Sequence, residues 1–316
     1  MESKKVAVLI PCYNEELTIG KVIQDFKKEL PDADIYVYDN NSKDDTSKIA
    51  CDNGAIVLKE SRQGKGNVVR SMFQDIEADV YIMVDGDDTY PADEVHKLID
   101  KVSNENVDMV IGDRLSNGTY ASENKRGFHN FGNNLVRTLI NKLFDNQIYD
   151  IMTGYRGFSK KFVKTVAIMS PGFQIETELT ITSLVHRYKV CEVPIVYRDR
   201  PDGSESKLNT FSDGFKVLIT LFDLCKGYKP LLFFGIISMI IGTLGLLVGF
   251  PVILEFMQFH YVYKVPSAIL ASSLLIISVL IMILGLITDH ISNQEKRSHE
   301  CSVNQWIYQE NKINHK

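Results

Sequence analysis

Cysteine is scarce in this chain and shows no pattern that would pair it. Five cysteines are scattered over 316 residues, with an odd total and no CxxC motif. This excludes a disulfide framework or a zinc site and favours reduced thiols in a cytosolic compartment. A strong excess of one charge is also lacking, because the formal net charge is only −5. Such mild acidity gives no reason to expect nucleic acid as a partner.

Two further signals are absent from the first part of the sequence. The first apolar run is too short for a signal peptide, and acidic residues follow it at once. A dinucleotide-binding enzyme would carry GxGxxG after its first strand, where this chain has "IPCYNEELTIG". The later stretch Arg62–Arg70, "RQGKGNVVR", contains GxG, which fits a tight turn before a helix as well as a ligand-binding loop.

Two long apolar runs, in contrast, are present near the end of the sequence. Leu231–Leu254 and Ala268–Ile287 contain no charged residue, and about 20 apolar residues are enough for a helix to cross a bilayer. We therefore predict two transmembrane helices, at about 231–254 and 267–288. Buried helices of a large soluble core are the alternative.

Basic residues predict the orientation of these spans. Lysines precede the first span and basic residues follow the second, whereas the connecting hairpin holds one lysine. By the positive-inside rule, the N-terminal region 1–209 and the polar tail 289–316 are cytoplasmic, which makes the chain a multi-pass protein of the cell membrane. Residues 210–229 place apolar side chains at helical spacing, which favours an interfacial amphipathic helix over one packed on the soluble region.

Short apolar runs alternate with amphipathic stretches between Val6 and about Arg200. Runs that are apolar on both faces and separated by helices are typical of a mostly parallel sheet with helices on both sides. The expected strands are residues 6–11, 34–39, 55–60, 80–85, 108–113 and 192–198. Polar clusters follow the strands, and ligands of such α/β folds bind at the carboxyl ends of the strands.

The stretch "VYIMVDGDDTYP" runs a buried strand into three aspartates. Asp85 and Asp87 are two residues apart, and in extended backbone such residues share a face. Both carboxylates would then converge on one Mg²⁺ or Mn²⁺, since these cations prefer oxygen ligands. A solvated acidic turn formed by Asp88, Thr89 and Pro91 is the alternative for this motif taken alone.

The motifs follow one another in a characteristic order: "IPCYNEE", the Asp39 cluster, "RQGKGN", "DGDDTYP", "MTGYRGFS", "FQIETEL" and "EVPIVYRDRPDGSESKL". This order resembles that of family 2 glycosyltransferases with the GT-A fold. Within the family, the chain is similar to dolichol-phosphate mannose synthase and bacterial polyprenyl-phosphate hexosyltransferases. The resemblance covers about Val6 to Leu208. It implies an α/β, Rossmann-like GT-A catalytic domain at 1–209.

The resemblance also implies roles for individual residues of the donor site. Asp85 and Asp87 correspond to the DxD motif that carries the metal and the diphosphate. Asn40 and Asn41 stand where the family has Asp and Gly, and Thr89 stands where this branch often has Gln. The residues implied to bind the nucleotide sugar are Pro11, Tyr13, Glu15, Asp39, Lys65, Asp85, Arg200 and Lys207.

On the acceptor side, Arg114 and Arg126 resemble arginines that grip the lipid phosphate, a task for which the planar guanidinium is suited. Either could instead be a surface ion-pair partner. Asp150 resembles an aspartate near the acceptor and is given an orienting role. In "FQIETEL", Glu176 and Glu178 fall on different faces of a helix, so we expect one to point into the site and the other to cap or pair locally.

Together, these implications predict an inverting hexosyltransferase that uses Mg²⁺ or Mn²⁺. It would move one hexose from UDP-glucose or UDP-N-acetylglucosamine to polyprenyl (undecaprenyl) phosphate at the cytoplasmic membrane surface, for cell-envelope glycans. A homo-oligomer is compatible with this prediction. The alternatives are a GDP-mannose-dependent synthase, a processive polysaccharide synthase, a soluble nucleotidyltransferase and a non-catalytic membrane scaffold. A processive synthase would show QxxRW and many spans, whereas the single tryptophan here, Trp306, lies outside such a motif.

Overall fold

The computed structural model describes residues 4–116, 137–138, 140–142, 146–172, 174–198, 200–201, 226–227 and 229–314. The chain divides into two compact units. The first comprises Met1–Gly214 together with Cys301–Lys316, and the second comprises Phe215–Glu300. The predicted site residues Arg126 and Lys207 and most of the predicted interfacial helix at 210–229 lie outside the described residues.

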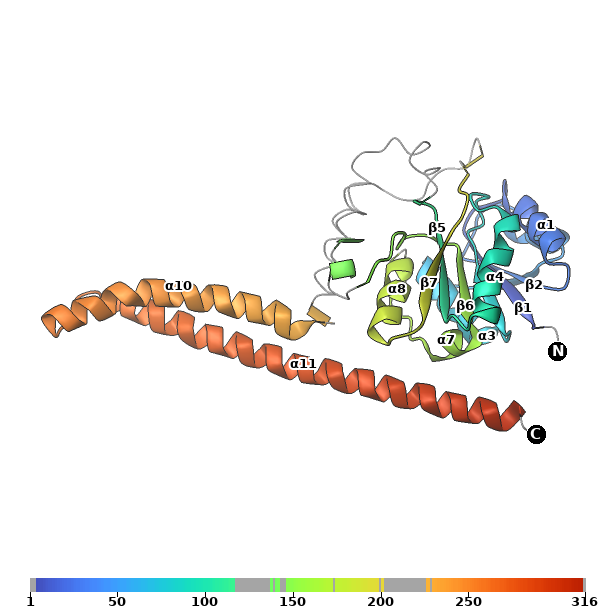
Figure 1. The fold of residues 1–316 in the computed structure, drawn as a ribbon. Coiled ribbons are helices and arrows are strands. Elements are labelled where there is room, and N and C mark those ends of the chain that lie inside the picture. The colour runs from blue at the N-terminus through green and yellow to red at the C-terminus, as the bar shows by residue number, and fades with distance from the viewer. Residues whose placement is uncertain are drawn as a thin grey trace. The chain divides into compact units, whose positions relative to one another are not determined.

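A seven-stranded sheet forms the centre of the first unit (Figure 1). Its spatial order is β3-β2-β1-β4-β6-β5-β7, and every pairing is parallel except those of β6 with β4 and β5. The strands are β1 (Val6–Cys12), β2 (Asp34–Asp39), β3 (Ile56–Lys59), β4 (Val80–Met83), β5 (Met109–Asp113), β6 (Arg156–Ser159) and β7 (Val190–Pro194). The predicted mostly parallel α/β sheet is therefore confirmed.

Two strands differ from the sequence-based expectation. The last strand was expected at 192–198, but β7 stops at Pro194 because its partner β5 ends at Asp113, opposite that proline. Strand β6 was not predicted, because its four residues "RGFS" are too few to show a pattern. It is inserted antiparallel between β4 and β5.

Helices cover both faces of the sheet, as the apolar runs predicted (Figure 1). Strands β4 and β5 are buried along their whole length, whereas the edge strand β3 is largely exposed. Helices α1, α2 and α4 belong to one face, and α3, α7 and α8 to the other. The helices are α1 (Ile19–Glu29), α2 (Thr46–Asp52), α3 (Lys65–Asp75), the 3-10 turn η1 (Ala92–Glu94), α4 (Val95–Asn104), α7 (Lys160–Thr165) and α8 (Ile175–Val185).

The strand order creates a switch point at one edge of the sheet. From β1 the chain passes to β2 and β3 on one side, and then returns to β4 on the other side of β1. The carboxyl ends of β1 and β4 therefore flank a crevice of the kind in which α/β proteins bind ligands. Because β6 is antiparallel, the residues that precede it come back to this same edge.

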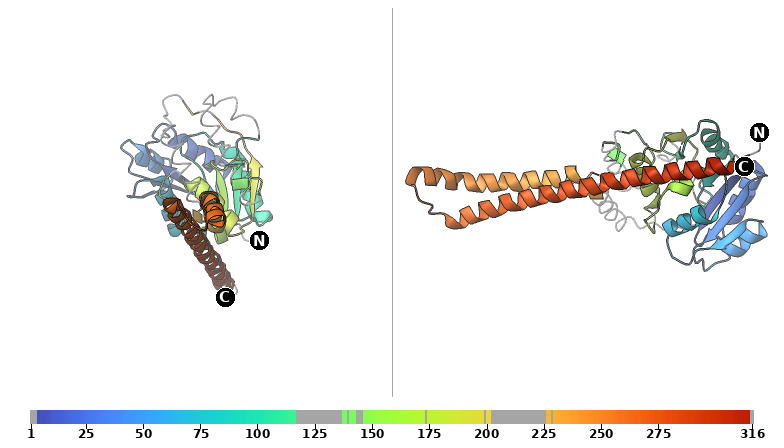
Figure 2. Two further views of the ribbon diagram at one scale, coloured as in Figure 1. Left: turned by 90° about the vertical axis from the view of Figure 1, so that its left-hand side faces the viewer. Right: turned by 90° about the horizontal axis from the view of Figure 1, so that it is seen from below.

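The second unit contains one long helix and the part of another as far as Glu300, which run antiparallel and side by side (Figure 2). Helix α10 (Pro230–Phe259) contains the first predicted span and α11 (Val265–Asn314) the second. Ser238 and Ser278 join them, each hydroxyl donating to the other residue's carbonyl at 2.8 Å. Gly245 lies against Leu274, which lets the backbones approach closely.

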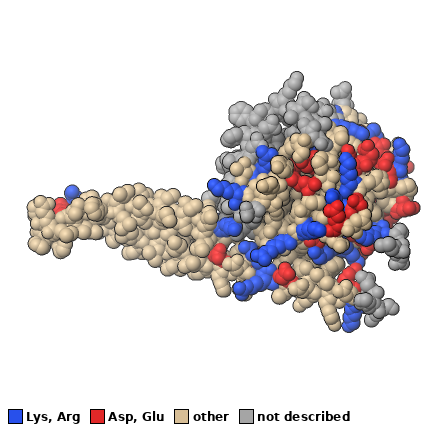
Figure 3. All heavy atoms as spheres, viewed as in Figure 1, with Lys and Arg blue, Asp and Glu red and all other residues tan. Residues whose placement is uncertain are grey.

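The surfaces of α10 and of the first part of α11, as far as Ile287, are apolar. Only 11% of the most apolar stretch of α10 and 17% of that of α11 is buried. This disfavours the alternative that the two apolar runs are buried helices of a soluble core. Figure 3 shows that the visible face of α10 and of the part of α11 beside it is largely free of charged side chains. Both helices are long and apolar enough to cross a membrane. Helix α11 continues beyond the predicted span to Asn314, so the predicted polar tail is helical as far as it is described.

The loop between β3 and α3 is held by buried polar groups. The Asn40 amide donates to the carbonyls of Glu60 and Arg62, both at 2.8 Å, and its oxygen accepts from the Gly64 N–H at 2.7 Å. An aspartate could not donate to two carbonyls. This requirement explains why asparagine suits a position where the family pattern has aspartate.

The carboxylate of Glu60 anchors the same loop. It accepts from the backbone N–H of Arg62 at 2.7 Å and from the guanidinium at 2.8 and 3.0 Å, and also from the Ser71 hydroxyl. The hydrogen bond from the Arg62 side chain is the main cause that lowers the pKa of Glu60 from 4.5 to about 2.

This lowered pKa predicts an acid-sensitive contribution to stability. Ionised Glu60 stabilises the folded state fully above pH 4.5, and the stabilisation is lost as the pH falls toward about 2. We expect Glu60→Gln to lower the thermal midpoint of the detergent-solubilised chain at pH 6, with the difference from wild type shrinking on acidification. The exposed Asp32 provides a control, Asp32→Asn. A Glu60→Gln deficit that stayed constant between pH 6 and pH 2.5 would contradict the assignment.

Candidate active site

Side chains from adjacent strands meet at the carboxyl edge of the sheet. Pro11 lies within β1, and Tyr13 and Glu15 follow that strand. Asp39 ends β2 and pairs in register with Cys12. Its buried carboxylate accepts from the Ser42 N–H at 3.0 Å. The residues predicted to bind the nucleoside are thus brought to one edge, and their contact with a ligand stays a prediction.

Polar contacts between two loops hold this part of the site. The Asn14 N–H donates to the Ser42 hydroxyl at 2.9 Å, and the Asn14 side-chain oxygen accepts from the Lys43 N–H at 2.8 Å. The Glu15 N–H donates to the Thr46 hydroxyl at 2.8 Å. Asn14 has a φ of 54°, a left-handed conformation that asparagine tolerates better than most residues. The segment after β1 is therefore fixed by the segment after β2.

The acidic motif forms a turn after β4. Gly86 and Asp87 lie in this turn, so the expectation that Asp85 and Asp87 share a face of extended backbone is wrong. The two carboxylates nevertheless interact. Burial and then the negative charge of Asp85 raise the pKa of Asp87. The Thr18 hydroxyl fixes the turn by donating to the Gly86 carbonyl at 2.6 Å.

Asp87 is buried and held on both of its oxygens. The Thr89 hydroxyl donates to Oδ1 at 2.7 Å, and Arg200 forms an ion pair with Oδ2 at 2.6 Å. Thr89, which stands where the family branch often has Gln, thus orients Asp87 directly. Arg200 lies at the acidic turn, and its contact with a nucleotide sugar stays a prediction.

Lys65 connects the acidic turn to α8. Its ammonium lies 2.5 Å from an oxygen of Asp85 and 2.6 Å from an oxygen of Glu176. Burial, the largest influence, lowers the pKa of Lys65, but the two carboxylates together raise it well above the usual value. Glu178 instead accepts from the backbone N–H groups of Met169 and Ser170, both at 2.8 Å. The expected division of the two glutamates therefore agrees with the geometry.

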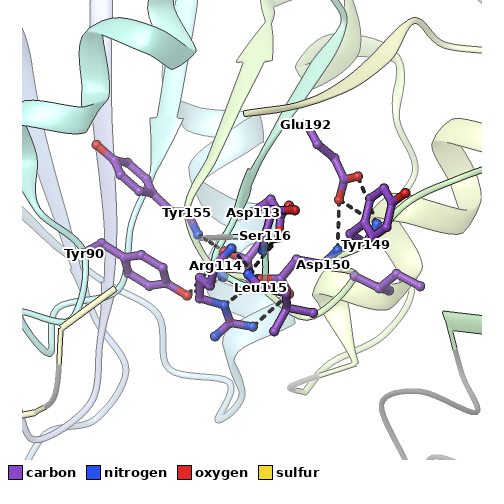
Figure 4. Close-up of polar contacts among 12 residues, drawn as sticks. Tyr90, Asp113, Arg114, Leu115, Ser116, Tyr149, Asp150, Tyr155 and Glu192 are labelled. Carbon is purple, nitrogen blue, oxygen red and sulfur yellow. Dashed lines mark hydrogen bonds and ion pairs between the residues drawn. The ribbon is translucent and has the colours of Figure 1, made fainter. Parts of the chain in front are cut away.

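Arg114 and Asp150 form a buried, two-pronged ion pair (Figure 4). The guanidinium donates to the two carboxylate oxygens at 2.7 and 2.9 Å, and the Arg114 backbone N–H donates at 3.1 Å. The guanidinium also lies over the Tyr197 ring, 5.3 Å from its centroid. Contact of Arg114 with a lipid phosphate stays a prediction.

The segment that joins Asp150 to β6 contacts the acidic turn. The Gly154 N–H donates to the Tyr90 hydroxyl at 3.1 Å. A Cβ on Gly154 would lie 2.3 Å from an oxygen of Asp85, so only glycine lets this carboxylate lie against the backbone. Neither Tyr90 nor Gly154 was predicted as a site residue, although Gly154 lies in the quoted motif "MTGYRGFS".

The acidic turn fits a divalent cation that arrives with a phosphate ligand. Among the described residues, no group of three or more His, Cys, Asp or Glu side chains could hold a metal by itself. Mg²⁺ in nucleotide sites commonly takes only one or two carboxylates, with substrate phosphates and water completing its shell. Asp85 and Asp87 provide such a pair. Their ion pairs with Lys65 and Arg200 show that this turn is stabilised by positive charge.

Comparison with known proteins identifies relatives over most of the chain. The model of the family "Glycosyl transferase family 2" matches residues 7–167. Glycosyltransferase AglJ of Haloferax volcanii is 32% identical over 90% of this chain and 93% of its own length. The dolichyl-phosphate hexose transferase of the same organism is 30% identical over 70% of this chain and 93% of its own length.

A solved structure shares the fold. Glucosyl-3-phosphoglycerate synthase of Mycobacterium tuberculosis, in complex with Mn²⁺, UDP-glucose and phosphoglyceric acid, aligns with a TM-score of 0.54. The alignment covers 71% of this chain and 80% of that one, at 19% identity. Likeness at this identity concerns the fold alone.

The buried position of Lys65 predicts a large stability effect. We expect Lys65→Met to lower the thermal midpoint strongly, because removing one partner of a buried ion pair costs roughly 3–5 kcal/mol. Lys21 is a matched control, since it also bridges two carboxylates, at 3.0 and 2.7 Å, but is half exposed. Lys21→Met should cost less than about 1 kcal/mol. Equal shifts of the midpoint in the two variants would show that burial does not strengthen the ion pairs of Lys65.

Proposed function

Because the chain belongs to glycosyl transferase family 2, we propose that it transfers one hexose from a nucleotide sugar to polyprenyl phosphate at a membrane surface. Family membership confirms the predicted resemblance and the predicted enzyme class, a hexosyltransferase. The observation that carries the proposal is the juxtaposition of two clusters of paired charges at one sheet edge. One is the acidic turn with Lys65 and Arg200, and the other is the Arg114–Asp150 pair.

The acidic turn supports binding of the donor. Asp85 and Asp87 would hold Mg²⁺ or Mn²⁺, which when bound would neutralise charge on the diphosphate and favour its departure. Lys65 and Arg200 would contribute positive charge to the same leaving group. The fold relative in complex with Mn²⁺ and UDP-glucose supports a UDP-sugar donor. UDP-glucose and UDP-N-acetylglucosamine are the donors that we propose, and GDP-mannose is the alternative.

The acceptor is proposed from the apolar helices and from the relatives. The dolichyl-phosphate hexose transferase is named for a lipid phosphate, and α10 and α11 would hold this chain at the bilayer that contains such a lipid, with undecaprenyl phosphate as the bacterial form. A phosphate oxygen is already anionic at neutral pH, so orientation matters more than a strong general base. The Arg114–Asp150 pair would supply that orientation.

The proposed reaction is a single displacement at the anomeric carbon. An oxygen of the acceptor phosphate forms the new bond to this carbon while the bond to the nucleoside diphosphate breaks. The electron pair of the broken bond leaves with the diphosphate, and the anomeric configuration inverts. No proton transfer from the acceptor is needed. The residues of the chain act by placing the two phosphate groups on opposite sides of the sugar.

Substitution in the acidic turn tests the donor site. In membranes supplied with undecaprenyl phosphate and labelled UDP-glucose, UDP-N-acetylglucosamine or GDP-mannose, we expect one UDP-sugar to yield labelled lipid. Asp87→Asn should lower that rate about a hundredfold, because it weakens the site for the metal and the diphosphate. Asp88→Asn is the matched control, since Asp88 belongs to the same turn but pairs with Lys21. Undiminished product from Asp87→Asn would refute the metal assignment, and product from GDP-mannose alone would favour the alternative donor.

We also propose the predicted domain division and orientation, with residues 1–209 and 289–316 on the cytoplasmic side. Four of the five native cysteines then lie in those two regions, and Cys225 precedes the first span on the same side. Tyr261, in the hairpin and 61% exposed, faces outward. An impermeant maleimide should label Tyr261→Cys in intact cells. It should label the wild-type chain and Tyr308→Cys, a tail variant, only after permeabilisation. Labelling of the wild-type chain in intact cells would reverse the orientation.

A further inference from the structure

Glu192 is a half-buried acidic residue at the start of the motif "EVPIVYRDRPDGSESKL", and neither the sequence analysis nor the proposed mechanism gives it a role. It lies in the middle of β7, opposite Ile111 of β5. Its carboxylate points at the backbone that precedes β6 (Figure 4). It accepts from the Tyr149 N–H with both oxygens at 2.9 Å and from the Asp150 N–H at 2.9 Å. A strand residue distant in sequence therefore holds the backbone of Asp150.

Two charged residues contact Asp150, Glu192 at its backbone and Arg114 at its side chain. Its backbone N–H is bound by Glu192, while its side chain accepts the two-pronged hydrogen bond from Arg114. Asp150 is 2% exposed and Arg114 9% exposed, so water competes little for the ion pair between them. Any displacement of the backbone at Asp150 would therefore move its carboxylate, and with it the guanidinium.

A second charged side chain, that of Arg156, holds the next part of the same segment. The Arg156 guanidinium, which is wholly buried, donates to the carbonyl of Ile151 at 2.7 Å and to that of Thr153 at 3.0 Å. An anion from β7 thus binds the N–H groups of this segment, and a cation from β6 binds its carbonyls. The negative carboxylate thus faces N–H groups, and the positive guanidinium faces carbonyl oxygens. This arrangement restrains the segment along its length.

We propose that Glu192 is a positioning residue for the acceptor side of the site. It fixes the backbone of Asp150, and through the Asp150 carboxylate it sets the direction of the Arg114 guanidinium toward the acceptor phosphate. The inference rests on the proposed function for the identity of the acceptor. The anchoring of Asp150 itself rests only on the hydrogen bonds that Glu192 accepts.

The chemistry of the carboxylate suits this task. Two oxygens without hydrogens can accept from two neighbouring N–H groups at once, and charge-assisted hydrogen bonds are stronger than neutral ones. Burial and the nearby charges of Asp113 and Asp150 raise the pKa of Glu192, while the two N–H donors lower it. Glutamine keeps one acceptor oxygen and nearly the same shape. Glu192→Gln should therefore preserve most of the effect, and Glu192→Ala should abolish it.

Asp108 provides a matched control. It is 5% exposed, and its carboxylate also accepts from a backbone N–H, that of Lys189, at 2.9 Å. Asp108 lies just before β5, whereas Glu192 binds the segment that precedes β6, at the opposite edge of the same sheet. Asp108→Asn thus removes charge from a buried backbone anchor without touching the residues around Asp150.

The experiment measures steady-state kinetics and hydrogen exchange on the full-length chain in detergent. Glu192→Ala should raise the KM for polyprenyl phosphate about tenfold, as expected for loss of charge-assisted hydrogen bonds. It should leave the donor KM within about twofold, because the Asp85–Lys65 contacts are intact. Peptides containing Tyr149 and Asp150 should exchange their amide hydrogens faster. Glu192→Gln should lie near wild type in all three measurements, and Asp108→Asn should change neither KM.

Three results would overturn the inference. They are an unchanged acceptor KM in Glu192→Ala, an equal rise in both KM values of that variant, or unchanged exchange at Tyr149 and Asp150. If the wild-type chain made no lipid-linked sugar from any donor, the proposed function would fail. The exchange measurement would then decide alone whether Glu192 anchors Asp150.

Discussion

The site depends on the pairing of carboxylates with cations, all buried or half-buried, at one edge of a sheet. Asp85 and Asp87 follow a buried strand, and burial together with the charge of Asp85 raises the pKa of Asp87. Lys65 and Arg200 bring positive charge to the two carboxylates from two different parts of the chain. The loop between β3 and α3, held by Asn40 and Glu60, leads directly into the helix that carries Lys65. The hydrogen bonds that hold this loop therefore also help to position the ammonium group of Lys65 beside the acidic turn.

A second ion pair, Arg114 with Asp150, likewise joins opposite charges at another part of the same sheet edge. There the opposite charges come from the end of β5 and from the segment before β6. The two clusters differ in one respect that fits their proposed tasks. The acidic turn presents carboxylates to a ligand that carries a cation, whereas the second cluster presents a guanidinium to a phosphate.

Much of this architecture could be predicted from the sequence, and the reasons are local. Runs such as Val80–Met83 are apolar on both faces, so they indicate a covered parallel sheet and place polar residues at its edge. The ordered motifs identified the family because their sequence along the chain is specific. The contacts that required the structure are those between distant residues of ordinary appearance. Nothing in "EVPIVYR" shows that Glu192 reaches back over 42 residues to Asp150. Strand β6 was too short to be recognised, and the turn at Gly86 replaced an expected extended segment.

The antiparallel direction of β6 has a consequence for how such a site could change. Because the chain enters β6 from the ligand edge, one short stretch borders the Asp85 carboxylate at Gly154 and carries Asp150 at its other end. A parallel strand at this position would have been entered from the opposite edge, and the two clusters would have been served by separate loops. With β6 antiparallel, an amino-acid replacement in this stretch affects both the acidic turn and the Arg114–Asp150 pair.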